Sequence, residues 1–283
     1  MPGDKFEQVG TDHFPVYGAE VSPEHRQMAR ELFNKYLKNK SVVPHSEHVY
    51  CTHTIVEENG ELIKFFMLDV RSLQEDPNKD YLASRIQPTL LGEAQKLWLL
   101  HELESSTAAI NVICSGIPYR YWKKYERWFH AFNLVAAKKS KMLFLGGQVH
   151  HNEFNTHTLI DPSSIHIPLI PGRVDPEDPG LPGIFVERTT MYEAVSSGVG
   201  QNFRKPGVNE EEEETAHRNN DDIIENQGLE GLPRNNYGII DFTDKLVFIT
   251  LYGQFADDMH YAAINRHDWT LKGYWNMQRS VPV

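Results

Sequence analysis

Long apolar runs are missing from this 283-residue sequence, and none approaches the roughly 20 residues that a membrane helix needs. The first ten residues, MPGDKFEQVG, also lack the apolar core of a secretory signal. Cysteine is scarce, and both Cys51 and Cys114 fall in predicted strands, which suits buried free thiols in a reducing compartment. We therefore expect a cytoplasmic or otherwise intracellular protein without a membrane span.

An excess of positive charge is missing too, since 39 acidic residues against 28 basic ones give a net charge of −11. Proteins that bind nucleic acid present a basic face to the phosphates, so we expect no nucleic-acid partner. Much of the negative charge is local, with a run of carboxylates at Glu210–Glu214. We interpret residues 205–235 as a mobile acidic insertion in a single domain that spans residues 1–283.

Hydrophobic spacing and turn residues predict alternating helices and strands in the first half of the chain. Ser22-Pro23 is a typical helix start, and the apolar positions that follow extend this helix to about Lys38. Two β-type runs joined by Asn59-Gly60 predict a hairpin. Two helix–strand units come next, so we expect a sheet covered by helices. The predicted ranges are 49–56 and 62–70 for the hairpin strands, 93–103 and 121–139 for the helices, and 110–115 and 142–145 for the following strands.

The sequence changes character beyond His157, where loops rich in proline and glycine separate β-type runs. These runs cover residues 188–195, 237–242, 246–255 and 259–264. We expect them to form antiparallel strands at the end of one continuous domain.

Residues suited to chemistry follow two of the apolar runs. Asp69 and Arg71 end the second hairpin strand, and His150 and His151 come just after a strand and a Gly-Gly turn. Enzymes of the α/β class place functional groups at the carboxyl ends of strands, on short loops. We therefore expect the functional site at these strand ends.

Four signatures in this order resemble the C-terminal half of the alkaline phosphatase D family. They are LDVR, LGEAQKLWL, ICSG and GGQVH, within Leu68–Gln74, Leu90–Leu103, Ile110–Pro118 and Met142–Phe154. The family pattern has LDxR, LGxxQxxWL, a strand ending in SG or SD, and a strand ending in GDxH. A fainter match continues through Met191–Val199 and Asn236–Phe242.

The resemblance implies an α/β, mixed-sheet, calcineurin-like metallophosphoesterase sandwich. Such enzymes hydrolyse phosphate mono- or diesters with water activated by divalent or trivalent metal ions. Calcium, iron, zinc and manganese all stay open, and the substrate would be a small phosphate ester. The family's N-terminal half precedes a WDDHE-like motif, and here GTDHF at Gly10–Phe14 resembles a degraded form of it. We therefore expect a sandwich that is incomplete at its N-terminal side.

The resemblance also implies a site. Asp12, Gln148 and His150 would be the metal ligands, with Gln148 standing where the family has a carboxylate, which makes metal binding weaker. His13 would stabilise the leaving group. Arg71 would clamp a phosphate through its bidentate fork, or would brace the strand end by pairing with Asp69.

Three functions stay open at this point. The first is the phosphoesterase, active or impaired, and the second is an inactive relative that acts as a binding or interaction protein. The third is an iron-dependent oxygenase that uses the histidines between His150 and His157, where His151 and Glu153 are otherwise ordinary neighbours. An exposed sheet edge, left where the absent half would pair, predicts self-association.

Overall fold

The structure is a computed structural model of the chain. It describes residue 18 and residues 21–37, 49–76, 88–147, 152–160, 188–196, 236–253 and 259–277. The predicted acidic insertion at residues 205–235 lies outside these ranges.

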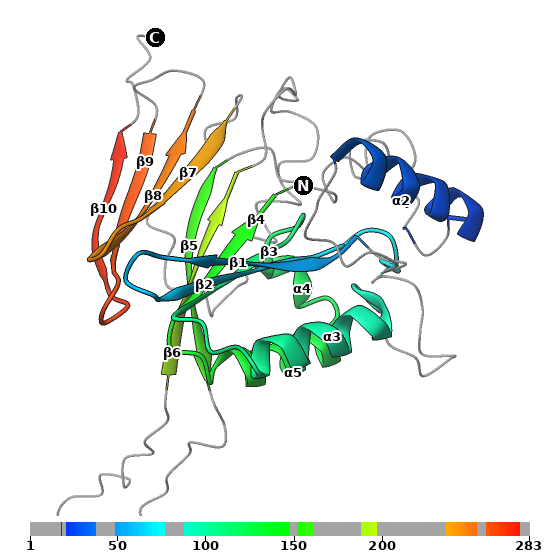
Figure 1. The fold of residues 1–283 in the computed structure, drawn as a ribbon, viewed down its shortest axis with the longest axis horizontal. Coiled ribbons are helices and arrows are strands. Elements are labelled where there is room, and N and C mark those ends of the chain that lie inside the picture. Colours follow the sequence, from blue (N-terminus) through cyan, green and yellow to red (C-terminus); the bar gives the residue numbers. More distant parts are fainter. Residues whose placement is uncertain are drawn as a thin grey trace, which may run out of the picture.

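A six-stranded mixed sheet forms the centre of the molecule, with strand order β1-β2-β3-β4-β6-β5 (Figure 1). Strands β2, β3, β4 and β6 are parallel, because helical crossovers connect the first three of them, whereas β1 and β5 run antiparallel at the two edges. The predicted mixed α/β architecture is thus confirmed. The strands are β1 (Cys51–Val56), β2 (Leu62–Met67), β3 (Ile110–Cys114), β4 (Met142–Gly146), β5 (Glu153–Ile160) and β6 (Arg188–Val195).

The hairpin predicted from Asn59-Gly60 joins β1 to β2. Gly60 has φ of 81°, a left-handed conformation that suits glycine, and the Asn59 side chain accepts a hydrogen bond from the Glu61 N–H at 2.9 Å. Strand β2 pairs with β3, and Asp69 and Arg71 follow β2 at its carboxyl end.

Helices cover one face of the six-stranded sheet. They are α3 (Gly92–Glu104), α4 (Tyr119–Trp122) and α5 (Glu126–Ala136). The single helix predicted over residues 121–139 is instead two helices, because Tyr125 leaves helical geometry (φ −114°, ψ 57°) and directs its hydroxyl to the Glu75 carbonyl. Aliphatic and aromatic side chains fill the space between helices and sheet, among them Phe66, Leu99, Trp122, Phe132 and Phe144.

Helix α2 (Pro23–Leu37) begins where the sequence predicts, with the Ser22 hydroxyl accepting a hydrogen bond from the His25 N–H at 3.3 Å. Among the described helices, none is both long enough and apolar enough to cross a membrane.

A second, four-stranded antiparallel sheet packs on the other face of the first sheet, in the order β10-β9-β8-β7 (Figure 1). Its strands are β7 (Tyr237–Phe242), β8 (Leu246–Tyr252), β9 (Met259–Asn265) and β10 (Leu271–Met277). The interface is apolar and includes Val112, Leu143, Tyr192, Ile249 and Ile264. The described residues therefore form three layers: helices, mixed sheet and antiparallel sheet.

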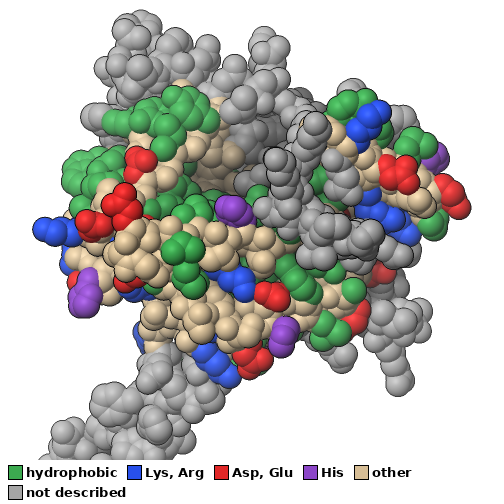
Figure 2. Space-filling model, viewed as in Figure 1, with side chains coloured by type: hydrophobic (Ala, Val, Ile, Leu, Met, Phe, Trp, Pro, Cys, Tyr) green, Lys and Arg blue, Asp and Glu red, His purple; other side chains and the backbone are tan. Residues whose placement is uncertain are grey.

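Hydrophobic side chains gather over the four-stranded sheet (Figure 2). Tyr237 and Trp275 remain 49% and 51% exposed. Aromatic rings form a row across three strands, in which Phe248 stacks on Tyr261 at 5.5 Å and Tyr261 lies 5.1 Å from Trp275.

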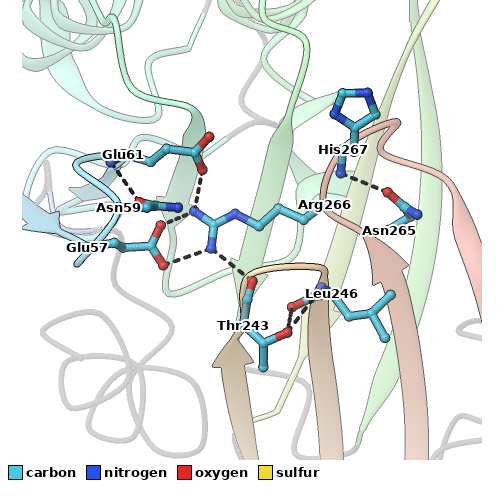
Figure 3. Close-up of polar contacts among 8 residues, drawn as sticks. All are labelled: Glu57, Asn59, Glu61, Thr243, Leu246, Asn265, Arg266 and His267. Carbon is cyan, nitrogen blue, oxygen red and sulfur yellow. Dashed lines mark hydrogen bonds and ion pairs between the residues drawn. The ribbon is translucent and has the colours of Figure 1, made fainter.

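An arginine ties the two sheets together at the end where β2 and β8 begin (Figure 3). The buried guanidinium of Arg266 binds both carboxylate oxygens of Glu57, donates to Glu61 Oε2 at 2.7 Å, and donates to the Thr243 carbonyl at 3.0 Å. The parallel strands finish at the opposite end of the two sheets.

Candidate functional site

The sequence-predicted ligands Asp12, Gln148 and His150 lie outside the described residues, as does His13. Arg71 is described, and so are residues on both sides of the 148–151 segment. The strand ends that flank these positions are therefore described, and they define the surroundings of the candidate site.

The loop after β2 is organised by the Asp69 carboxylate. Its Oδ1 accepts hydrogen bonds from the N–H groups of Arg71 and Ser72 at 3.1 and 2.9 Å, and its Oδ2 accepts one from the Ser72 hydroxyl at 2.6 Å. The buried Arg71 guanidinium donates to Gln74 Oε1 at 2.8 Å. Asp69 thus braces the loop through the Arg71 backbone.

Gln95 on α3 holds the same loop from the other side. Its Oε1 accepts from the Asp69 N–H at 2.8 Å and its Nε2 donates to the Asp69 carbonyl at 2.7 Å, so one buried amide pairs with both backbone groups of Asp69. Gly92 starts α3 with φ of 72°, and a Cβ there would lie 2.4 Å from Leu73 Cδ1. The LDVR and LGEAQ signatures therefore contact each other and form one structural unit.

The chain near the predicted Asp12 and His13 also contacts this loop. A Cβ built on Gly18 would lie only 1.7 Å from the Arg71 carbonyl oxygen, so the backbone at Gly18 rests directly on the loop. This contact places Gly18 at the carboxyl end of β2.

At the carboxyl ends of β4 and β6, residues from both sheets meet. Gly146, Val195 and Glu153 are register partners across β4, β6 and β5. Asn152, Ser196 and Asn236 lie at this end. Asn152 Nδ2 donates to the Tyr252 carbonyl on β8 at 3.0 Å, and Ser196 Oγ donates to Asn236 Oδ1 at 2.9 Å. These two hydrogen bonds join the sheets at the end opposite Arg266.

A buried polar network lies on the helix face of β5 and β6. The fully buried Glu193 accepts from the Tyr119 N–H at 2.7 Å through Oε1, and from His157 Nε2 at 2.7 Å and Asn155 Nδ2 at 3.2 Å through Oε2. Gly146 lies beside this network, where a Cβ would lie 3.1 Å from Val195 Cγ2 and 3.2 Å from Pro118 Cα. One side chain thus holds β6, β5 and the start of α4.

Arg120 extends this network to Glu153. Its guanidinium pairs with Glu153 Oε2, which also accepts from Asn155 Nδ2 at 3.1 Å. Burial acts to lower the pKa of Arg120, but the Glu153 carboxylate outweighs it and raises the pKa, so the guanidinium stays charged. Burial and the nearby Glu193 raise the pKa of Tyr119, whose hydroxyl stays neutral.

The sequence interpretation did not identify Glu193, Asn155 or Asn152 as site residues. A signal was present, because Glu153, Asn155 and His157 alternate with the period of a strand and therefore share one face. Glu153 and His157 are engaged by Arg120 and Glu193, and among the described residues no group of three His, Cys, Asp or Glu side chains is placed to hold a metal. That arrangement gives no support to the oxygenase alternative.

Residues 25–134 match the family model of the PhoD-like phosphatases. This stretch of the chain is similar to that family. The predicted resemblance to the alkaline phosphatase D family is thereby confirmed.

The matched stretch contains most of α2, the hairpin, the Asp69 loop, α3, β3, α4 and most of α5. A solved structure titled "Structure of PhoD" superposes with a TM-score of 0.57 at 16% identity, covering 90% of this chain and 49% of that one. At this identity the likeness shows the fold, and the chain spans about half the length of that structure. No curated protein sequence matches the chain.

Proposed function

We propose that this protein is a metal-dependent phosphoesterase that hydrolyses small phosphate mono- or diesters. The observation that carries the proposal is the PhoD-like match over residues 25–134, which spans the loop after β2 and the helices that hold it. The described strands β2, β3, β4 and β6 run parallel, so the Asp69 loop, the SG turn after β3 and the Gly-Gly turn after β4 share one edge.

In this proposal the two sheets form a calcineurin-like sandwich and the site lies at its strand-end edge. Asp12, Gln148 and His150 would hold the metal, which when bound supplies a Lewis acid and an activated water. His13 would stabilise charge on the leaving oxygen. Calcium, manganese, zinc and iron are the candidate ions.

Asn152, which follows the 148–151 segment, supports the proposal of a metal at this edge. Gly147 precedes Gln148 directly, and Asn152 follows the 148–151 segment as a buried residue fixed to β8. Both ends of that short segment therefore start from ordered strands. Asn152 also has an amide oxygen that no described group binds. An oxygen donor of this kind suits a hard or borderline cation.

Arg71 has a positioning role in this account. Its guanidinium is buried and donates to Gln74, which in turn donates to the Tyr125 hydroxyl at 3.2 Å. These two hydrogen bonds link the β2 loop to the start of α5.

The experiment is hydrolysis of p-nitrophenyl phosphate and bis-p-nitrophenyl phosphate by the purified chain with added Mn²⁺ or Ca²⁺. His150→Ala and Asp12→Ala should each abolish turnover, Gln148→Asp should raise it, and His151→Ala is the matched control that should change little. Turnover that survives both His150→Ala and Asp12→Ala would refute the assigned site. An absence of both turnover and bound metal would favour the inactive relative instead.

A further inference from the structure

Asn152 is a fully buried residue whose amide is satisfied on one side only. Nδ2 donates to the Tyr252 carbonyl at 3.0 Å, whereas Oδ1 is shielded from water and has no hydrogen-bond partner. Buried side-chain oxygens are normally hydrogen-bonded, so an unpaired one calls for an explanation.

The orientation of the amide is dictated by its neighbour. The Tyr252 carbonyl can only accept, so the NH₂ group must face it and the oxygen must face the other way. Exchanging the two atoms would place two acceptors against each other and leave an unpaired donor. The unpaired group is therefore an acceptor, and what it lacks is a donor or a cation.

Asn152 lies at the carboxyl ends of β4 and β6. Glu153 pairs with Val195, so Asn152 lies at the end of β5 next to Ser196, and the Ser196 N–H donates to the Gly146 carbonyl at 3.2 Å. Gly146 ends β4, the strand that leads to Gln148. The hydroxyl of Ser196 is directed to Asn236, so it does not satisfy the Asn152 oxygen.

The other polar residues of β5 do not share this property. Asn155 alternates to the opposite face, where its Nδ2 bridges Glu153 and Glu193. Asn155 in β5 thus belongs to a hydrogen-bonded network, whereas Asn152, just before β5, has a buried oxygen without a hydrogen-bond partner.

We propose that the Asn152 amide oxygen is a ligand for a hard or borderline cation at the strand-end edge, an inference that rests on the proposed phosphoesterase site. A neutral oxygen donor favours Mn²⁺ and Ca²⁺ over Zn²⁺. The hydrogen bond to Tyr252 holds the amide in one orientation, so in this proposal its oxygen is preorganised for the ion.

The test is direct Mn²⁺ binding, measured by the loss of the free-ion electron paramagnetic resonance signal during titration of the whole chain. Asn152→Ala should weaken Mn²⁺ binding by at least about tenfold, as expected for loss of a metal-site contact. Asn152→Asp should bind Mn²⁺ at least as tightly as the natural chain, since it retains an oxygen. Both variants lose the donor to Tyr252, so a purely structural role for Asn152 predicts that they behave alike. Circular dichroism confirms that each variant is folded.

Ser196→Ala is the matched control, because it removes the other hydrogen bond that joins the sheets at this end. Its Mn²⁺ affinity should stay within a factor of about three. Equal Mn²⁺ affinity in the natural chain and Asn152→Ala would overturn the inference and leave the phosphoesterase proposal standing. Failure of the natural chain to bind Mn²⁺ at all would overturn both. Mn²⁺ binding that depends on Asn152, without hydrolysis of either chromogenic ester, would support the inference and refute the proposed function.

Discussion

Replacing Gln95 with leucine should lower the free energy of unfolding substantially, although Gln95 is not one of the proposed catalytic or metal-binding residues. Leucine keeps the size and the helix propensity of the side chain. The change removes the pairing with the N–H and C=O of Asp69, at 2.8 and 2.7 Å, inside the helix–sheet core. Each buried group left unpaired costs about 1–3 kcal/mol, so the two together cost about 2–6 kcal/mol. A domain has a total stability of only about 5–15 kcal/mol.

Urea unfolding, followed by tryptophan fluorescence and circular dichroism, measures this loss. The matched control is Gln27→Leu on α2, since Gln27 is exposed and donates to Glu31 Oε1 on the same helix at 2.9 Å. The control should change the free energy of unfolding by less than about 0.5 kcal/mol. A loss below about 1 kcal/mol for Gln95→Leu would show that the LGEAQ signature does not hold the Asp69 loop.

Three further predictions concern other parts of the chain. Arg266→Ala should lower the free energy of unfolding by about 2–4 kcal/mol in urea titrations, because it leaves the Glu57 carboxylate without its buried partner, and an unchanged midpoint would contradict the clamp. Burial, with the nearby Cys51, raises the pKa of the Cys114 thiol from 9.0 to about 12, so iodoacetamide should modify it at pH 8 only after unfolding. The same shift adds stability that is complete below pH 9 and lost as the pH rises towards about 12, and rapid labelling of the folded chain would refute both statements. If the exposed edge strand β1 mediates self-association, Val56→Lys should reduce it in light scattering, whereas Leu97→Lys on exposed α3 should not.

Sequence reasoning predicted the parts of the fold that local rules determine. The Asn59-Gly60 turn, the Ser22 cap and the apolar runs of β3 and β4 each identify an element without reference to its neighbours. The break at Tyr125 could not be predicted in this way, because it depends on a hydroxyl contact with Glu75, 50 positions away.

The candidate site was predicted less completely, for a related reason. Strand β5 was not expected, since Glu153, Asn155 and His157 give it a polar face that is typical of an exposed segment. Their burial becomes intelligible only when Glu193 and Arg120 are placed opposite them by the sheet order. The Asp69 and Arg71 pairing was anticipated as a brace, but the partner of each side chain came from elsewhere in the loop.

The most direct test of a metal-dependent phosphoesterase is to measure metal content and p-nitrophenyl phosphate turnover on the same sample, before and after chelation and during stepwise return of Mn²⁺. The account predicts that turnover disappears with the metal and returns in proportion to the Mn²⁺ bound, and that His150→Ala recovers neither. Turnover that is unaffected by complete removal of the metal would contradict it, and so would full Mn²⁺ occupancy without turnover.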